Sequence, residues 1–392
     1  MNKVWITLIS GLACVFLTTG CWDMKELNDR AIVISSAIDT TDDGHILLTD
    51  QFANPSALGH NVESPNERFY SMSSKGDTVL QAAQLLQLRL SRNIFVGHRR
   101  NIFIGQQTAK NGLNEIIDEF TRSPDSRIRT DMSIVQGANA GNVLKIPSVV
   151  EKLPSIAALK SRSVVGGGPP GTTYVEFLRA AASKTTCPTL PLVKIESHPS
   201  DYMADAGSHQ LRFAGRAVFD KKLRMVGQID YTETVYRFWE VGHLTHQTFA
   251  VKIPNTGQSM SVYTNHLKSK LKVRLKKRHL DVAVFLYGDG RITENNTSLS
   301  LQKQSNIDKV QTALEQQIQS GLLQLIQRVQ QDYHTDIFRF DRTCQKNYPL
   351  EWSKVTDQWP EIFSHATVHV YAHIPIKTIG EMGTALHQHV QM

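Results

Sequence analysis

Residues 305–332 read SNIDKVQTALEQQIQSGLLQLIQRVQQD, and this stretch decides the architecture of the second half of the chain. Its apolar residues recur every three or four positions, which is the spacing of one face of an α-helix. The opposite face is largely glutamine. Such a helix is about 40 Å long and has a single apolar face to bury. The residues of that face are Ile307, Val310, Leu314, Ile318, Leu322, Leu325, Val329 and Tyr333.

Segments rich in β-branched residues lie on both sides of the helix and supply the surface that it covers. Directly before the helical region, Tyr287-Gly288-Asp289-Gly290 predicts a turn, and residues 367–374 predict a closing strand. We therefore expect residues 208–392 to form an α+β domain in which the long helix packs on an antiparallel sheet. The expected earlier strands are residues 211–219, 248–253, 259–263, 268–275 and 281–286.

The first half of the chain alternates between strand and helix patterns, which predicts an α/β region over residues 21–200, either as one domain or as two subdomains. The polar stretch 198–208 predicts the boundary with the second domain. The whole mature chain is thus expected to be a multi-domain mixed α/β protein. Expected helices are residues 78–90, 113–120, 139–144 and 174–183, and expected strands are 31–38, 45–52, 101–104, 131–135 and 190–196.

The turn between the first two strands contains Asp42, Asp43 and Gly44. Gly44 can adopt the positive φ that a tight hairpin turn requires. A loop that binds a cation is the alternative, but a calcium loop needs more oxygen ligands at regular spacing than this segment offers. A β-hairpin turn is therefore the preferred interpretation.

The first 20 residues have the pattern of an export signal. Lys3 and the amino terminus are positive, and an uncharged, mostly apolar run from Val4 to Leu17 follows. This run is shorter than the roughly 20 apolar residues that span a bilayer. Thr18-Thr19-Gly20-Cys21 resembles the lipobox of bacterial lipoproteins, although Thr18 stands where Leu is usual.

We therefore expect residues 1–20 to be a signal peptide that is removed, and Cys21 to receive a lipid. The mature chain is then attached to the membrane through this anchor and does not cross it. The alternative is an uncleaved N-terminal helix in which Cys21 has no such role.

Composition sets broad limits on the class of protein. A hydrophobic content of 41% and a charged content of 20% are ordinary for a globular chain. The net charge of +7 is compatible with anionic phospholipid, cell-wall polymer or nucleic acid and selects none of them. Beyond the leader and Cys21, the chain has Cys187 and Cys344, which are either two free thiols or one disulfide.

No familiar catalytic or metal motif is present, and we predict no catalytic, cofactor-binding or metal-binding residue. The sequence lacks G-x-S-x-G, C-x-x-C, H-E-x-x-H and Walker patterns. His365, His369 and His373 would share one face of a strand, but neighbours would be about 13 Å apart, too far to bind one ion. The glycine- and proline-rich residues 161–173 predict a surface loop, because Pro169 and Pro170 lack the N–H groups that cradle phosphate.

A basic segment runs from Lys268 to His279, where cations alternate with Leu271 and Val273. On a strand this alternation gives one basic face. That face either meets phospholipid head groups or belongs to a solvated edge strand that its lysines protect from aggregation. The second interpretation is favoured, and nucleic acid is not expected as a partner of an exported protein.

Several stretches together resemble one known family. The residues Gly20-Cys21-Trp22-Asp23-Met24-Lys25-Glu26-Leu27-Asn28-Asp29-Arg30 resemble the start of the mature C-subunit lipoproteins of spore germinant receptors, the Ger(x)C family. Further similar blocks follow in order over nearly the whole mature chain. One departure is Arg339-Phe340-Asp341, where relatives tend to have Gly-Phe-Gly. The similar blocks are residues 97–105 with Ala109, Gly112 and Leu113, residues 120–125, residues 330–338, and Trp352 with Trp359, Ile362 and Phe363.

The resemblance implies a non-enzymatic subunit on the outer face of the spore inner membrane. Its partners would be a multi-spanning A-type subunit and a transporter-like B-type subunit. The fold would consist of several mixed α/β domains. Because the B-type subunit is the usual candidate for binding the nutrient, no ligand pocket is assigned to this chain.

Three functions are therefore compared. The leading hypothesis is a subunit for assembly or coupling of a germinant receptor. The alternative is a solute-binding lipoprotein of a transport system, which predicts a cleft between domains. A cell-wall enzyme is the third, and it predicts converging acid and base residues, for which the sequence offers no paired carboxylates.

Overall fold

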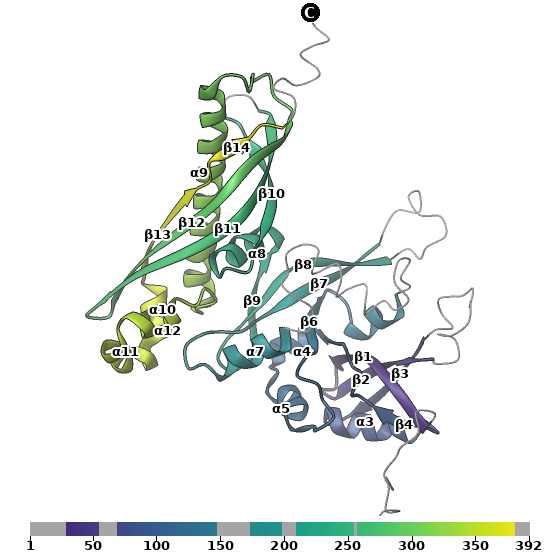
Figure 1. Cartoon of the computed structure of the whole chain (residues 1–392). Helices are drawn as coiled ribbons and strands as arrows, with labels where there is room; N and C mark the ends of the chain where they lie inside the picture. Colours follow the sequence, from purple (N-terminus) through teal and green to yellow (C-terminus); the bar gives the residue numbers. More distant parts are fainter. Residues whose placement is uncertain (1–28, 55–68, 147–172, 198–208, 255–256, 381–392) are drawn as a thin grey trace, which may run out of the picture.

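A computed structural model describes residues 29–54, 69–146, 173–197, 209–254 and 257–380 (Figure 1). These residues form a 9-stranded sheet and a 5-stranded sheet with helices packed around them. The mixed α/β class is confirmed, as is the long helix of the second half. The leader, Cys21 and the glycine- and proline-rich run near residue 168 lie outside the described residues.

The 9-stranded sheet combines parallel and antiparallel pairing. Its centre, β1, β5, β6 and β7, is parallel, as expected for strands connected through helices. Antiparallel strands flank this centre on both sides, and the short β4 pairs with the beginning of β1. The order is β3(Phe69–Gly76), β2(Ile46–Ala53), β1(Arg30–Thr40), β5(Asn101–Gly105), β6(Asp131–Gln136), β7(Thr189–Ser197), β8(His209–Phe219) and β9(Met225–Asp230), with β4 at Asn93–Phe95.

Helices cover this sheet on both faces. One face shares a core with four helices, in which Ile104, Ile134 and Phe177 are fully buried. The other face packs against the 3-10 helix η3(Ala140–Lys145), which takes the place of the helix expected at 139–144. The four helices are α3(Val79–Gln87), α4(Gln106–Asn111), α5(Asn114–Arg122) and α7(Thr173–Ala182).

Two very long strands form the centre of the 5-stranded sheet. The strands expected at 259–263 and 268–275 are one strand, β11(Ser259–Lys276), with an irregularity at His266, whose φ is 51°. It pairs antiparallel with β12(His279–Asn295) and, near its beginning, with β10(His246–Lys252). The two long strands therefore make a hairpin that extends beyond the other strands (Figure 1).

The turn predicted at residues 287–290 is wrong, because β12 continues through it. Gly288 and Gly290 are glycines for a packing reason. A Cβ on Gly288 would lie 2.6 Å from the Leu267 side chain, and a Cβ on Gly290 would lie 2.7 Å from that of Ile376. Glycine here permits close packing within a continuous strand.

The closing strands join the sheet parallel to β12, so the sheet is not wholly antiparallel. A helical connection precedes them, as a parallel crossover requires. Its long helix α9 buries Val310, Leu314, Ile318 and Leu322 on one face, as the periodicity predicts. The elements are α9(Gln304–Arg328), η4(Val329–Tyr333), α10(Phe340–Asn347), α11(Pro349–Val355), η5(Thr356–Gln358), α12(Trp359–Ser364), β13(Thr367–His373) and β14(Ile376–Thr378).

The connection between the two sheets is α8(Tyr231–Glu240), which follows β9 directly. Asp230 and Glu233 form a capping box at its beginning, with reciprocal bonds of 2.8 Å. The strand expected at 211–219 in the second domain is β8, and that placement is wrong, because β8 pairs with β7 and β9 in the first sheet. The described residues of the first sheet therefore continue to Asp230. The division of the chain at residues 200–208 stays a prediction.

Candidate functional site

The residue predicted to be lipidated, Cys21, lies outside the described residues, so its modification stays a prediction. Within the described ranges, no helix is long and apolar enough to cross a membrane. No three His, Cys, Asp or Glu residues gather there at a spacing that would hold a metal ion. His369 and His373 are both exposed on β13, on one face as expected for a strand.

The two cysteines of the folded regions are buried free thiols, which is one of the two alternatives that the sequence left open. Burial raises the pKa of both thiols, Cys187 and Cys344, to about 12. A thiol with so high a pKa holds little of the reactive thiolate form. Both side chains lie in the hydrophobic core of the second sheet.

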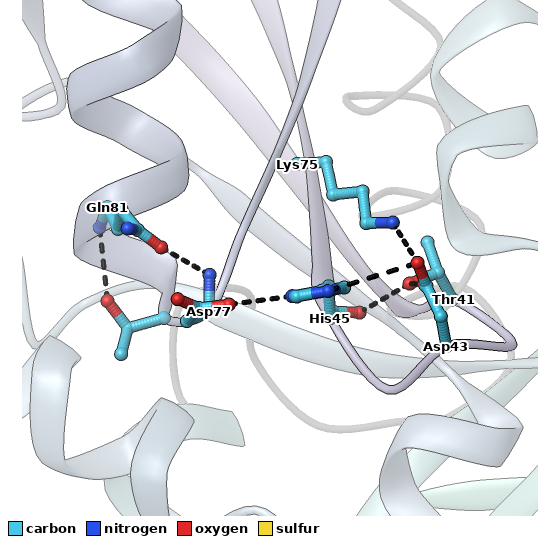
Figure 2. A network of polar contacts seen from close by, with 7 residues as sticks. Thr41, Asp43, His45, Lys75, Asp77 and Gln81 are labelled. Atoms are coloured by element: carbon cyan, nitrogen blue, oxygen red, sulfur yellow. Dashed lines mark hydrogen bonds and ion pairs between the residues drawn. The ribbon is translucent and has the colours of Figure 1, made fainter.

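A polar network surrounds the β1–β2 turn (Figure 2). His45 lies between two carboxylates, with its Nδ1 2.7 Å from Asp77 and its Nε2 3.9 Å from Asp43. Lys75 also contacts the Asp43 carboxylate, and this contact lowers the pKa of Asp43 to about 2. Gly44 has a φ of 84°, so the predicted tight turn is confirmed.

This network fastens the turn to the beginning of α3 and carries no binding function that we can identify. The Asp43 carboxylate accepts hydrogen bonds from Thr41 and Lys75, which occupy it with protein groups. At the other end of the network, the backbone N–H of Asp77 donates to Gln81, close to the Thr78 cap of α3 (Figure 2). The role of these residues is therefore structural.

A hollow of about 900 Å³ lies between α3, α5 and the beginning of β2. Its lining combines apolar side chains such as Val79 and Ile116 with the acidic Glu115, Asp118 and Glu119. All of these elements belong to the first sheet and its helices. The hollow is therefore not the cleft between domains that the solute-binding hypothesis predicts.

The junction between the two sheets is the most elaborate polar site among the described residues. The segment that connects α7 to β7 is held there from two sides. Asp341, at the start of α10, accepts hydrogen bonds on one carboxylate oxygen from the hydroxyls of Thr185, at 2.6 Å, and Thr186. From the opposite side, Lys221 donates to the backbone oxygens of Ala180, at 3.2 Å, and Thr186, at 3.1 Å.

Asp336 is the buried centre of this junction and is 1% exposed. Its carboxylate accepts from the backbone N–H of Phe338 and of Asp341, at 2.9 and 3.0 Å, and from the Trp359 indole at 3.2 Å. Its own backbone oxygen accepts from the N–H of Cys187 at 3.0 Å. Burial, followed by the neighbouring Asp341 carboxylate, raises the pKa of Asp336 to about 7.

A second contact of the junction joins β9 to the end of the long helix. The Tyr333 hydroxyl donates to the backbone oxygen of Gln228 at 2.9 Å, and its ring lies directly against Gly227. Arg328 of α9 donates to the Tyr333 hydroxyl at 3.0 Å and forms an ion pair with Glu233 of α8. The two sheets are thus linked at points far apart in the sequence.

Buried charges accumulate between these contacts. Arg237 of α8 is 5% exposed and donates to the backbone oxygen of Ile337 at 2.9 Å. The carboxylate of Glu240, 3% exposed, has no hydrogen-bond partner in the described part of the chain, and burial raises its pKa well above the usual value. Burial likewise lowers the pKa of Arg339.

The departure from the family pattern at Arg339-Phe340-Asp341 has a structural explanation. Arg339 has a φ of 62°, a left-handed conformation that glycine adopts without steric cost. A glycine at this position would therefore fit the backbone better than arginine does. At the third position, the Asp341 side chain supplies the hydrogen bonds to Thr185 and Thr186 described above.

Asp336 lies in one of the blocks that resemble the family, residues 330–338, but its local sequence predicts no role for it. Its partners come from residue 187 on one side and residue 359 on the other. The one local signal was an aspartate between apolar residues, in Thr335-Asp336-Ile337-Phe338. A charged residue in such a run is buried with partners more often than alone.

The geometry defines a mixed α/β protein of two sheets that share a buried polar junction. Residues 23–195 match the family described as "Spore germination protein N-terminal domain", and residues 214–380 match "Spore germination B3/ GerAC like, C-terminal". The first match ends within β7, and the second begins within β8 and includes β9, so the two family models meet inside the 9-stranded sheet.

The chain belongs to the Ger(x)C family of spore germination proteins, as the ordered sequence blocks predict. It is 25% identical over 388 residues to the putative spore germination protein YfkR of Bacillus subtilis (strain 168), covering 98% of each chain. It is 22% identical over 364 residues to spore germination protein KC of the same organism, covering 89% of each. The crystal structure of the GerBC protein has the same fold, with a TM-score of 0.57 at 17% identity, covering 91% of this chain and 100% of that one.

Proposed function

We propose that this protein is the lipid-anchored, non-enzymatic C-type subunit of a spore nutrient germinant receptor, where it acts in receptor assembly or coupling. The main support is that similarity to spore germination proteins extends over 98% of the chain, not over one region. The similarity on which the proposed role in germination rests therefore includes both sheets and is not confined to one of them.

The junction supports coupling as the form of this role. Thr185 and Thr186 come from the first region, and Asp341 comes from the second, yet all three side chains are buried together. Because buried polar contacts fix one arrangement of the groups that make them, the two regions are expected to move as one body. A partner bound to one region would then be held at a defined position relative to the other.

The anchor is the second part of the proposal. Residues 1–20 would direct export and be removed, and a lipid on Cys21 would hold the domains on the outer face of the spore inner membrane. Tethering raises the effective concentration of the domains for membrane-embedded partners. Those partners are the A-type and B-type subunits of the receptor, and no nucleic acid, cofactor or metal is involved.

A germination assay tests this function. A clean deletion in a strain without a redundant receptor should abolish the response to one nutrient and leave vegetative growth and sporulation normal. Complementation with the wild-type gene should restore the response, whereas Cys21→Ala should restore it poorly because the anchor is lost. Normal germination of the deletion strain with every nutrient would refute the proposal.

The alternative is a solute-binding lipoprotein, whose candidate site is a hollow within the first region and not the cleft between domains that this function predicts. The hollow between α3 and α5 has a volume of about 900 Å³, which is large enough for a small solute. Titration calorimetry with the chain from Asp23 onward distinguishes the two functions. Saturable heat with one nutrient, lost in Glu119→Gln, would support solute binding, whereas the receptor-coupling role predicts no heat.

A further inference from the structure

One face of the 5-stranded sheet carries an uninterrupted row of cations. On β11 every second side chain from residue 268 to 276 is basic and exposed, whereas Val273 and Leu275 between them are buried against the helices. Successive side chains of a strand alternate between faces, so the cations share the face away from the core. The row is about 26 Å long at about 3.3 Å per residue. Its residues are Lys268, Lys270, Lys272, Arg274 and Lys276.

These cations form no ion pairs in the part of the chain that the structure describes. The one acidic residue directly opposite the row is Asp281, across from Arg274, and it is ion-paired with His279 at 3.1 Å. None of the ion pairs found there includes a residue of the row, although other basic residues such as Lys75, Arg224 and Arg328 are paired. The sequence from 268 to 278 contains no Asp or Glu. The row therefore gives this face a positive charge that side chains of the described residues do not neutralise.

Aromatic side chains lie beside the row on the same face. Phe285 of β12 is opposite Lys270, and its ring stacks on Tyr371 of β13 with centroids 5.1 Å apart. The Lys272 ammonium lies 5.2 Å from the centre of the Phe285 ring. Tyr371 is 49% exposed and Tyr287, the next outward residue of β12, is 40% exposed. Lysine beside tyrosine and phenylalanine is the composition of surfaces that meet lipid head groups.

The tip of the hairpin adds two more cations in an unfavourable backbone conformation. Lys277 and Arg278 form the two-residue turn between β11 and β12, and their φ values are 46° and 68°. Hairpin turns of this type strongly prefer Asn-Gly, since both central residues have positive φ. Two basic residues thus occupy positions where Asn-Gly would fold more easily, and they extend the positive face to the tip of the hairpin.

We propose that this basic sheet face, formed by the row from Lys268 to Lys276 with Lys277 and Arg278, docks on the surface of an anionic phospholipid bilayer. The charge of the face is complementary to such a surface, and its exposed tyrosines suit the interface. An extended sheet face fits a broad, laterally uniform charged layer better than it fits a single ligand. The inference goes beyond the proposed function, because it requires neither the lipid on Cys21 nor a receptor partner.

Vesicle binding tests the proposal with the chain from Asp23 to Met392, which contains every described element but lacks the leader and Cys21. Vesicles of phosphatidylcholine alone are compared with vesicles that also contain phosphatidylglycerol. We expect binding only to the anionic vesicles, and weaker binding as salt concentration rises. Equal binding to both kinds of vesicle, or none to either, would overturn the proposal.

Two triple variants with the same change in net charge locate the binding face. Because each cation near an anionic surface strengthens binding about fivefold, Lys268→Gln/Lys270→Gln/Lys272→Gln should weaken it roughly a hundredfold. The control replaces three exposed lysines elsewhere on the molecule and should weaken binding by less than about fivefold. If both variants weaken vesicle binding by the same factor, the net charge of the protein determines binding, and the proposal for this face is wrong. The control is Lys110→Gln/Lys303→Gln/Lys309→Gln, on α4 and at the beginning of α9.

The turn offers a variant that we expect to fold at least as well as the wild type. Lys277→Asn/Arg278→Gly places the preferred residues in the tip and should raise Tm, yet it should weaken vesicle binding at least tenfold. A higher Tm with unchanged binding would contradict a role for the tip. If the wild-type chain ignores anionic vesicles while the row variant abolishes germination in vivo, the face binds an acidic protein and the bilayer proposal is wrong.

Discussion

The double variant Thr185→Val/Thr186→Val removes the hydrogen bonds that join the two regions at Asp341. Valine has nearly the shape of threonine, so the change deletes two hydroxyl donors without opening a cavity. Both hydroxyls donate to the same carboxylate oxygen, and all three residues are buried. The Asp341 carboxylate would keep only the backbone N–H of Arg342, at 2.8 Å on its other oxygen.

The expected cost follows from the charge of the acceptor. A hydrogen bond to a charged group contributes about 1.5–3 kcal/mol, so two of them amount to about 3–6 kcal/mol. The matched control is Thr234→Val, which removes a buried hydroxyl that donates to the neutral backbone oxygen of Asp230 at 2.7 Å. A neutral bond of this kind contributes about 1 kcal/mol.

Urea unfolding followed by tryptophan fluorescence measures both variants. In the chain from Asp23 onward, the tryptophans are Trp239, Trp352 and Trp359, which all lie in the second region, so fluorescence follows the unfolding of that region. Circular dichroism follows both regions. We expect the free energy of unfolding to fall by at least about 2 kcal/mol more in the double variant than in the control. We also expect the fluorescence and circular dichroism transitions of the double variant to occur at different urea concentrations. A double variant as stable as Thr234→Val, with coincident transitions, would refute the coupling role of this contact.

Three further predictions concern the same junction. Burial and Asp341 raise the pKa of Asp336 from 3.8 to about 7. Protonation of Asp336 therefore stabilises the fold fully below about pH 4, and this stabilisation is lost as pH rises through 7. Asp336→Asn should flatten that part of a plot of unfolding free energy against pH. Arg339→Gly should raise the free energy of unfolding by about 1 kcal/mol, because φ is 62° there, whereas the control Arg342→Gly inside α10 should lower it by about as much. Gly227→Ala should cost about 1–3 kcal/mol in thermal unfolding, because the new methyl group would overlap the Tyr333 ring, and an unchanged Tm would show that the ring moves freely.

Periodicity predicted the elements whose side chains alternate between core and solvent. The face of α9 and the β1–β2 hairpin follow directly from apolar spacing and from turn chemistry at Gly44. The strand β3 was not predicted, because its sequence FYSMSSKG is largely polar and its residues are only half buried. Its place in the sheet depends on pairing with β2, which local sequence does not encode.

The turn predicted at residues 287–290 was wrong because tertiary packing, and not turn formation, explains the glycines there. Gly288 and Gly290 have the composition of a turn, but they are glycines because Leu267 and Ile376 lie against them. The junction could not be predicted either, since Thr185 and Asp341 are 156 positions apart. The basic row, by contrast, was visible in the sequence, because alternation alone places its side chains on one face of a strand.

The central claim is that the folded regions are tethered to the membrane through one modified cysteine. Intact-protein mass spectrometry of the native protein, extracted from spore membranes, tests it most directly. We predict a chain that begins at Cys21, lacks residues 1–20 and carries the added mass of a diacylglycerol group. A chain that still begins at Met1, with Cys21 unmodified, would contradict the account.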